Sequence, residues 1–283
     1  MYSISELYIY PIKSLGGIAV SETVLTDRGP QHDRRWMLVD ENNSFLTQRE
    51  YPQMALLQTN IEEGQLIVFH KNRREDKIKL SLFPGQLSTV TVKVWDDYCT
   101  AQFVSTEADA WFSKQLSISC RLVYMPDNSI RNVDNNYALN GEITGFSDGF
   151  PLLMIGQQSL NDLNDHMDQP LPMNRFRPNI VFAGGDPYIE DGMEHFMINT
   201  IEFYGVKLCA RCPITTTDQE TAIRYKEPLK TLASYRSRNN KVYFGQNVLY
   251  NKPGVIKIGD TINIIKWKES AAFNDGISST NII

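Results

Sequence analysis

The sequence has few cysteines and lacks any long apolar run. Four cysteines in a chain of 283 residues are too few for a disulfide-stabilised scaffold. No window approaches the roughly 18–20 consecutive apolar residues of a membrane-spanning helix, so we expect no membrane partner. The N-terminus has no basic region followed by an apolar stretch, as a signal peptide would have. Together these absences predict a cytoplasmic protein.

Basic residues are also fewer than acidic residues. The 28 Lys and Arg residues are outnumbered by 33 Asp and Glu residues, which gives a formal net charge of −5. A general nucleic-acid-binding protein needs an excess of cations to neutralise phosphates, and we therefore expect no nucleic-acid partner. Because net charge averages over the whole surface, it does not exclude one local basic pocket.

The motifs of several common enzyme classes are missing. The chain has no glycine-rich dinucleotide or phosphate-binding loop, no paired-histidine zinc motif and no serine nucleophile elbow. Its histidines are scattered without the spacing of metal ligands, at His32, His70, His166 and His195. A lone histidine is more often a surface or buried structural group than a catalytic one. We therefore assign no catalytic role to any of the four.

Short segments rich in β-branched and aromatic residues make up most of the chain. They predict strands at 7–10, 18–25, 36–39, 65–69, 90–95, 121–125, 179–182, 200–204 and 255–265. Helical spacing of apolar residues occurs at 106–116, at 159–167 after a Ser159 N-cap, and at 227–235 with Pro228 in the first turn. Many strands with few helices predict a mainly β fold with barrel-like lobes, because strand edges must be closed or covered.

A polar stretch at 126–149 divides the chain. It is rich in Asn and Gly and shows little apolar periodicity. We therefore predict an N-terminal domain at 1–125 and a second domain at 148–270, joined by a connecting segment at 126–147. The residues at 271–283 are polar enough to form a loose C-terminal tail.

The pair Cys209-x-x-Cys212 is the first candidate for chemistry, and its spacing leaves several interpretations open. Structural zinc needs a second close pair of ligands, which Cys99 and Cys120 do not provide. A redox dithiol needs a helix after the pair, but the residues that follow are β-branched. One thiolate could instead bind a heavy metal, favoured by the charge of Arg211. Two buried, inert cysteines are the remaining alternative.

Other basic residues stand in turns. Lys13 and Ser14 precede a Gly-Gly pair, and Arg34 precedes a strand-like segment. Arg177 leads through Pro178 to Asn179 and another such segment. An arginine at a strand entrance is often only a solvated charge. Arginine nevertheless matches phosphate through its planar fork of donors, so these turns would form an anion pocket if they converged.

Several segments occur together, in this order: YPIKS at 10–14, DRRW at 33–36, SDGFP at 147–151, FRPNIV at 176–181, CARCPITTTD at 209–218, KEPL at 226–229, FGQ at 244–246 and GVIKIGD at 254–260. In this combination they resemble the MOSC-domain proteins. The resemblance is to the branch of the mitochondrial amidoxime reducing component and its bacterial relatives, and it covers nearly the whole chain.

The resemblance implies an N-terminal β-barrel lobe and a MOSC β-barrel lobe with a few helices. It also implies a molybdopterin-type molybdenum cofactor held between them. Cys212 would be the catalytic residue and the protein's ligand to molybdenum, with Cys209 a neighbour. The residues that the resemblance assigns to cofactor binding are Lys13, Ser14, Arg34, Arg177, Asn179, Arg211, Thr216 and Asp218. These residue types suit such a cofactor, because its phosphate needs fixed cations and molybdenum favours a soft thiolate. Asn179 is expected to offer a donor and an acceptor to the pterin edge.

The implied function is a molybdenum-dependent oxidoreductase that removes oxygen from N-hydroxylated compounds such as amidoximes and N-hydroxylated bases. The chain has no four-cysteine iron–sulfur pattern, so we expect a separate electron-donor protein. We expect neither an iron–sulfur cluster nor pyridoxal phosphate in this chain. Two alternatives of other classes stay open. One is a carrier that holds sulfur or the molybdenum cofactor on Cys212, and the other is a cofactor-free protein with a degenerate site.

Overall fold

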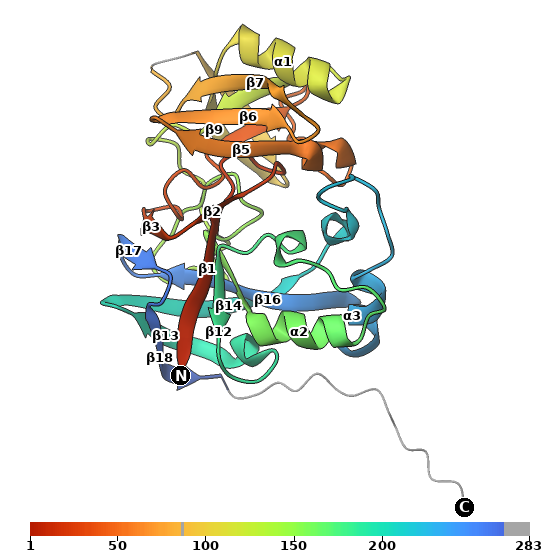
Figure 1. Cartoon of the computed structure of the whole chain (residues 1–283). Coiled ribbons are helices and arrows are strands. Elements are labelled where there is room, and N and C mark those ends of the chain that lie inside the picture. The colour runs from red at the N-terminus through yellow and green to blue at the C-terminus, as the bar shows by residue number, and fades with distance from the viewer. Residues whose placement is uncertain (86–87, 269–283) are drawn as a thin grey trace, which may run out of the picture.

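The computed structural model describes residues 1–85 and 88–268, which form two lobes (Figure 1). One lobe, drawn mainly in orange and yellow, contains small sheets and helix α1 (Thr106–Leu116). The other lobe, drawn mainly in green and blue, contains helices α2 (Gln157–Asp165) and α3 (Leu229–Tyr235). Strands make up most of the regular structure, which confirms the predicted mainly β fold. None of the described helices is long and apolar enough to cross a membrane.

The first lobe is an open half-barrel built from two small sheets. Its elements are β4 (Trp36–Val39), the 3-10 helix η1 (Pro52–Leu56), β5 (Leu57–Glu62), β6 (Gln65–His70), β7 (Arg73–Ser81), β8 (Thr89–Val94), β9 (Asp97–Phe103) and β10 (Arg121–Tyr124). One sheet has the order β4-β10-β9-β8 and the other has the order β5-β6-β7. Both sheets and α1 contribute side chains to one core, among them Trp36, Val68 and Phe112, which are fully buried.

The second lobe is a closed barrel of seven strands. They are β1 (Tyr2–Ile9), β11 (Leu152–Gly156), β12 (Ile180–Ala183), β13 (Met193–Ile198), β14 (Ile201–Ala210), β16 (Lys241–Tyr250) and β18 (Thr261–Trp267). The order is β11-β12-β1-β18-β13-β14-β16, and β16 pairs with β11 to close the barrel. Alternate residues of β12 face different cores: Ile180 and Phe182 share one apolar cluster, whereas Val181 packs with residues of α2 and α3.

The first strand of the chain belongs to the second lobe. β1 lies between β12 and β18 and pairs antiparallel with both. The short strands β2 (Ile18–Val20) and β3 (Glu22–Leu25) pair with β1 and with β17 (Gly254–Lys257), respectively. Residues 1–125 are therefore shared between the two lobes. The domain boundaries at 125 and 148 stay a prediction, and the predicted tail at 271–283 lies outside the described residues.

The polar segment between the lobes is fixed to the rest of the protein. Arg131 is only 4% exposed and donates to the carbonyl oxygens of Gly145 at 3.0 Å and Ser147 at 2.7 Å. Its guanidinium also pairs with Asp97 of β9 at 2.8 Å. Because charged donors hold these carbonyls, the loop that follows at 147–151 has a defined position.

The observed bounds of the three helices agree only in part with the predicted ones. α1 has the predicted bounds, and the side chain of Ser105 caps it by accepting a hydrogen bond from the amide of Ala108. The predicted Ser159 N-cap is wrong, because α2 begins at Gln157 and Ser159 lies inside it. The Ser159 hydroxyl instead donates to Glu190 at 2.8 Å, since a buried carboxylate requires donors. α3 begins at Leu229, after the predicted start at 227.

Candidate active site between the lobes

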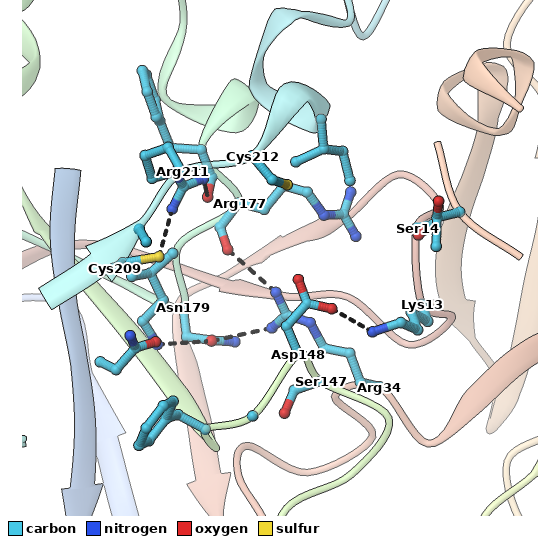
Figure 2. Close-up of a pocket in the computed structure, with 18 of the residues that line it drawn as sticks. Lys13, Ser14, Arg34, Ser147, Asp148, Arg177, Asn179, Cys209, Arg211 and Cys212 are labelled. Atoms are coloured by element: carbon cyan, nitrogen blue, oxygen red, sulfur yellow. Dashed lines mark hydrogen bonds and ion pairs between the residues drawn. The ribbon is translucent and has the colours of Figure 1, made fainter. Parts of the chain in front are cut away.

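A pocket lies where the two lobes meet, and it contains most of the predicted site residues (Figure 2). The space between its lining residues, including the part that is open to solvent, is about 820 Å³. Its wall is formed by the turns before β4 and β12, the loops after β1 and before β11, and the end of β14. The predicted residues in this wall are Lys13, Ser14, Arg34, Arg177, Asn179, Arg211 and Cys212.

Three of these residues have left-handed backbone conformations. The φ angle is +67° at Ser14, +46° at Arg34 and +56° at Arg177. Residues other than glycine seldom adopt this region, and such residues concentrate at functional sites when the surrounding structure holds them. Each of the three lies in a turn that supplies a polar side chain to the pocket wall.

Arg34 and Arg177 of the pocket wall stack on one aromatic ring. The central carbon of each guanidinium lies 4.3 Å from the ring centroid of Tyr10, which is 2% exposed. Arg34 also pairs with the buried Asp33 at 2.7 Å, and Arg177 donates to the carbonyl of Leu15 at 2.6 Å. Burial lowers the pKa of Arg177 to about 10. Both guanidinium groups are therefore held in place by the protein itself.

Asn179 lies in the pocket wall, but its amide is already engaged by the protein. Its Nδ2 donates to Tyr8 O at 3.2 Å and to Asp33 Oδ1 at 3.1 Å. Its Oδ1 accepts hydrogen bonds from Arg34 at 3.1 Å and from the amide of Leu153 at 3.3 Å. Both donor hydrogens are thus used, so in this structure Asn179 positions Arg34 and Asp33 and has no free donor for a pterin edge.

Lys13 forms the opposite side of the pocket. It is 5% exposed, and its Nζ donates to Phe146 O at 2.8 Å and to Asp148 Oδ1 at 2.6 Å. Burial lowers the pKa of Lys13 to about 8, although the charge of Asp148 opposes this shift. An anion bound beside the amine would compensate the cost of burying its charge.

Arg211 and Cys209 interact with each other at the end of β14. Arg211 Nη1 donates to Cys209 Sγ at 3.1 Å, and Nη2 donates to Phe176 O at 2.7 Å. Arg211 Nε is buried and has no partner among the described residues. Burial raises the pKa of Cys209 although Arg211 opposes the shift, so Cys209 stays a neutral thiol at neutral pH.

Cys212 follows directly after this pair. It is the N-cap residue of the short 3-10 helix η4 (Pro213–Thr216), and its carbonyl accepts hydrogen bonds from the amide and hydroxyl of Thr215. These bonds fix its backbone beside the pocket. Among the described residues no hydrogen bond involves Cys212 Sγ, and the side chain lines the pocket with its sulfur available to a ligand.

Thr216 and Asp218 are not in the pocket wall, although both were predicted to bind the cofactor. The Thr216 hydroxyl donates to Pro213 O at 2.7 Å within η4. Asp218 accepts hydrogen bonds from the backbone and hydroxyl of Thr221 and lies 3.5 Å from Arg175. Both side chains shape the loop after Cys212, so the structure gives no support for a direct contact with a cofactor.

Sequence reasoning missed two charged residues in the pocket wall, Arg49 and Asp148. Asp148 belongs to the SDGFP segment, but its spacing gave no sign that it would meet Lys13. Arg49 follows a polar segment without a recognisable motif, and its guanidinium stacks on Trp95 at 3.9 Å. Their roles depend on loops that are distant in sequence, which is why local patterns could not reveal them.

The donor set fits the implied cofactor. Five cationic side chains and one carboxylate line the pocket, together with the sulfur of Cys212; the cations are Lys13, Arg34, Arg49, Arg177 and Arg211. This excess of positive charge and the orphaned Arg211 Nε match an anionic, phosphate-bearing group. The described residues contain no cluster of three or more His, Cys, Asp or Glu side chains that would hold a metal without further ligands. A metal at Cys212 thus needs ligands from a cofactor.

Comparisons with known proteins identify the family of the chain. The model of the MOSC N-terminal beta barrel domain matches residues 1–119, and the model of the MOSC domain matches residues 142–263. Mitochondrial amidoxime-reducing component 1 of Mus musculus is 30% identical over 281 residues, covering 93% of this chain and 82% of that protein. Mitochondrial amidoxime reducing component 2 of Bos taurus is 31% identical over 285 residues, covering 92% of this chain and 82% of that protein.

A second kind of relative matches as well. Molybdenum cofactor sulfurase of Oryza sativa subsp. japonica is 31% identical over 267 residues, covering 86% of this chain but 32% of that protein. The crystal structure of the YUAD protein from Bacillus subtilis has a TM-score of 0.42 at 8% identity, covering 95% of this chain and 98% of that one. This structural likeness is too weak to bear on function. By its sequence relatives, the chain belongs to the MOSC-domain proteins that carry an N-terminal MOSC β-barrel domain.

Proposed function

We propose that this protein is a molybdenum cofactor-dependent oxidoreductase that reduces N-hydroxylated compounds, such as amidoximes and N-hydroxylated bases. One observation carries the proposal: the half-buried Cys212 and five cationic side chains line the same pocket between the lobes. The similarity to amidoxime-reducing components supports this choice of reaction. We place the activity in the cytoplasm, with electrons supplied by a separate redox protein.

Different pocket residues would hold different parts of the cofactor. Cys212 would be the protein's ligand to molybdenum, and Lys13, Arg34, Arg177 and Arg211 would bind the phosphate and polar edge of the pterin. When bound, the cofactor supplies a metal centre that removes the oxygen atom from the N–O bond of the substrate. Ser14 would add a hydroxyl beside Lys13.

Other residues hold these cationic side chains in position. Asn179 and Asp33 hold Arg34 by hydrogen bonds, and the ring of Tyr10 supports Arg34 and Arg177. Arg211 keeps its hydrogen bond to the neutral thiol of Cys209, which leaves Cys212 as the sulfur for the metal. The cationic groups are thus fixed before a cofactor arrives, which lowers the ordering cost of binding.

The proposal is tested with Cys212→Ser, produced in a host that makes the molybdenum cofactor. We expect the variant to lose bound molybdenum and the reduction of benzamidoxime with a chemical electron donor, because serine offers no soft thiolate. Cys209→Ser is the matched control and should keep its molybdenum. If Cys212→Ser keeps both its molybdenum and its reductase activity, the proposal is wrong.

The similarity to a molybdenum cofactor sulfurase favours a second candidate, a carrier of sulfur or cofactor that uses the same cysteine. The same assay separates the two functions. A carrier would bind the cofactor or a persulfide at Cys212 but would show no turnover of benzamidoxime with an electron donor present. Steady turnover that depends on Cys212 would exclude a carrier role as the whole function.

A further inference from the structure

Asp148 is the one acidic side chain among the described residues that line the pocket. It lies in the loop between the connecting segment and β11, and 65% of its side chain is exposed. Because five cationic side chains line the same pocket, the carboxylate is not needed to complete an anion-binding wall. Its presence requires a different explanation from that of its neighbours.

The carboxylate is held through one of its two oxygens. Asp148 Oδ1 accepts hydrogen bonds from Lys13 Nζ at 2.6 Å and from Trp95 Nε1 at 3.2 Å. Asp148 Oδ2 accepts none from the described residues, and Figure 2 shows the single link from Asp148 to Lys13. One oxygen thus fixes the orientation of the group, while the other is available to a ligand.

The surroundings also keep this group ionised. Partial burial raises the pKa of Asp148, but the charge of Lys13 and the hydrogen bonds from Lys13 and Trp95 outweigh it. The net pKa lies well below its usual range, so the group is an anion throughout the physiological pH range. It can accept hydrogen bonds there but cannot donate one.

A groove on the first lobe adjoins the pocket at this point. Thr47 and Arg49 line both spaces, and the groove is also lined by the aromatic side chains of Phe45 and Trp95. The rings of Phe45 and Trp95 are 5.2 Å apart, and Arg49 stacks on Trp95. Arg49 covers one face of Trp95, and the 37% of Trp95 that is exposed offers an aromatic surface next to Asp148 for the body of a planar molecule.

N-hydroxylated amidines and guanidines carry N–H donors on the same planar group as the N–O bond, and their reduced products are cations. A carboxylate beside an aromatic surface suits these groups, whereas an N-oxide without N–H donors gains nothing from it. Building on the proposed function, we propose that Asp148 is a specificity-determining residue that accepts the N–H of amidine-type substrates through Oδ2, with the substrate body in the groove beside Trp95. Asp148 takes no part in breaking the N–O bond.

The test is the binding of benzamidine, a stable cationic amidine, to cofactor-loaded protein by titration calorimetry. Asp148→Asn keeps an acceptor for Lys13 and removes the negative charge. We expect its Kd for benzamidine to rise about tenfold or more, which corresponds to one charge-assisted hydrogen bond. Asp186→Asn is the matched control, because Asp186 is exposed and lies outside the pocket and the groove. This control should bind as the wild type does.

A second measurement separates this role from others. The molybdenum and pterin content of Asp148→Asn should equal that of the wild type, and the KM for benzamidoxime should rise more than kcat falls. An unchanged Kd, no binding of benzamidine to the wild type, or loss of pterin from Asp148→Asn would each overturn the assignment. Asp148-dependent binding without any reductase turnover would instead preserve the amidine site and refute the proposed function.

Discussion

Arg177 performs two tasks in the pocket wall. Its Nη1 binds the carbonyl of Leu15 at 2.6 Å, and its planar group stacks on Tyr10 with a left-handed backbone behind it. Burial lowers its pKa to about 10, so it stays a cation at neutral pH while carrying a desolvation cost. A bound phosphate or pterin oxygen would offset that cost, which makes Arg177 a sensitive probe of cofactor binding.

We expect Arg177→Ala to lower the amount of pterin that copurifies with the protein. Loss of a charge-assisted hydrogen bond costs roughly 1.5–3 kcal/mol, which is on the order of ten- to a hundredfold in affinity. The measurement is the pterin content per protein, with the melting temperature of the cofactor-free variant as a check on folding. Arg177→Lys keeps the charge but loses the planar fork, so it should fall between the wild type and Arg177→Ala. Unchanged pterin in Arg177→Ala would contradict this role.

The candidate site could be predicted in part from single residues. Lys13, Arg34, Arg211 and Cys212 stand in motifs, and the structure brings them into one pocket. The structure does not support the predicted pterin contact of Asn179, because hydrogen bonds to residues distant in the sequence already use its amide. Asp148 was missed for the same physical reason: its partner Lys13 is 135 positions away in the sequence. Contacts between loops of different lobes leave no local pattern.

Helix α2 is attached to the barrel through a buried carboxylate. Glu190, in the 3-10 helix η3 (Ile189–Gly192), is fully buried and accepts hydrogen bonds from Gly156 N and from the Ser159 hydroxyl. Burial, reinforced by Asp191, raises the pKa of Glu190 to about 7. The folded protein therefore binds a proton more tightly at this group than the unfolded chain does.

This raised pKa predicts how stability depends on pH. Between about 4.5 and about 7 the native state holds the Glu190 proton that the unfolded state has lost, so stability falls as the pH rises. Glu190→Gln removes this titration. We expect the difference in unfolding free energy, wild type minus Glu190→Gln, to decrease across this window by on the order of 1 kcal/mol per pH unit. Urea unfolding of both proteins at a series of pH values measures this difference in unfolding free energy. A difference that stays constant between pH 4.5 and 7 would contradict the raised pKa of Glu190.

Elements with a strong local signal were predicted well. α1 has a capping serine and apolar residues on one face, and β4 is a continuous apolar run; both have the predicted bounds. β7 was missed because two thirds of its sequence, RREDKIKLS, is charged and it covers only one side of a core. The predicted strand at 255–265 is two strands, since Gly259 has φ +90° in the turn between β17 and β18.

The arrangement of the whole chain depends on its first strand. β1 completes the barrel between β12 and β18, although the whole of the other lobe lies between β1 and β12 in the sequence. Figure 1 shows this strand in the second lobe, below the orange strands that follow it in the sequence. Mainly β composition and two lobes could be predicted from the sequence, but such a non-local pairing could not.

We expect the segment 142–268, expressed without β1, to fail to fold. Without this strand, β12 and β18 would present unpaired edges, and the apolar side chains of Ile4 and Leu7 would be missing from the barrel core. Circular dichroism and denaturant unfolding, with the full chain as the control, provide the measurement. A soluble fragment with a cooperative unfolding transition would show that the barrel closes without β1.

The central claim is that Cys212 binds the metal of a molybdenum cofactor in the pocket between the lobes. X-ray absorption at the molybdenum edge, applied to the wild type, Cys209→Ser and Cys212→Ser, tests it most directly because it counts the sulfur neighbours of the metal. We expect Cys209→Ser to match the wild type and any metal retained by Cys212→Ser to have one sulfur neighbour fewer. An identical sulfur shell in Cys212→Ser would contradict the claim.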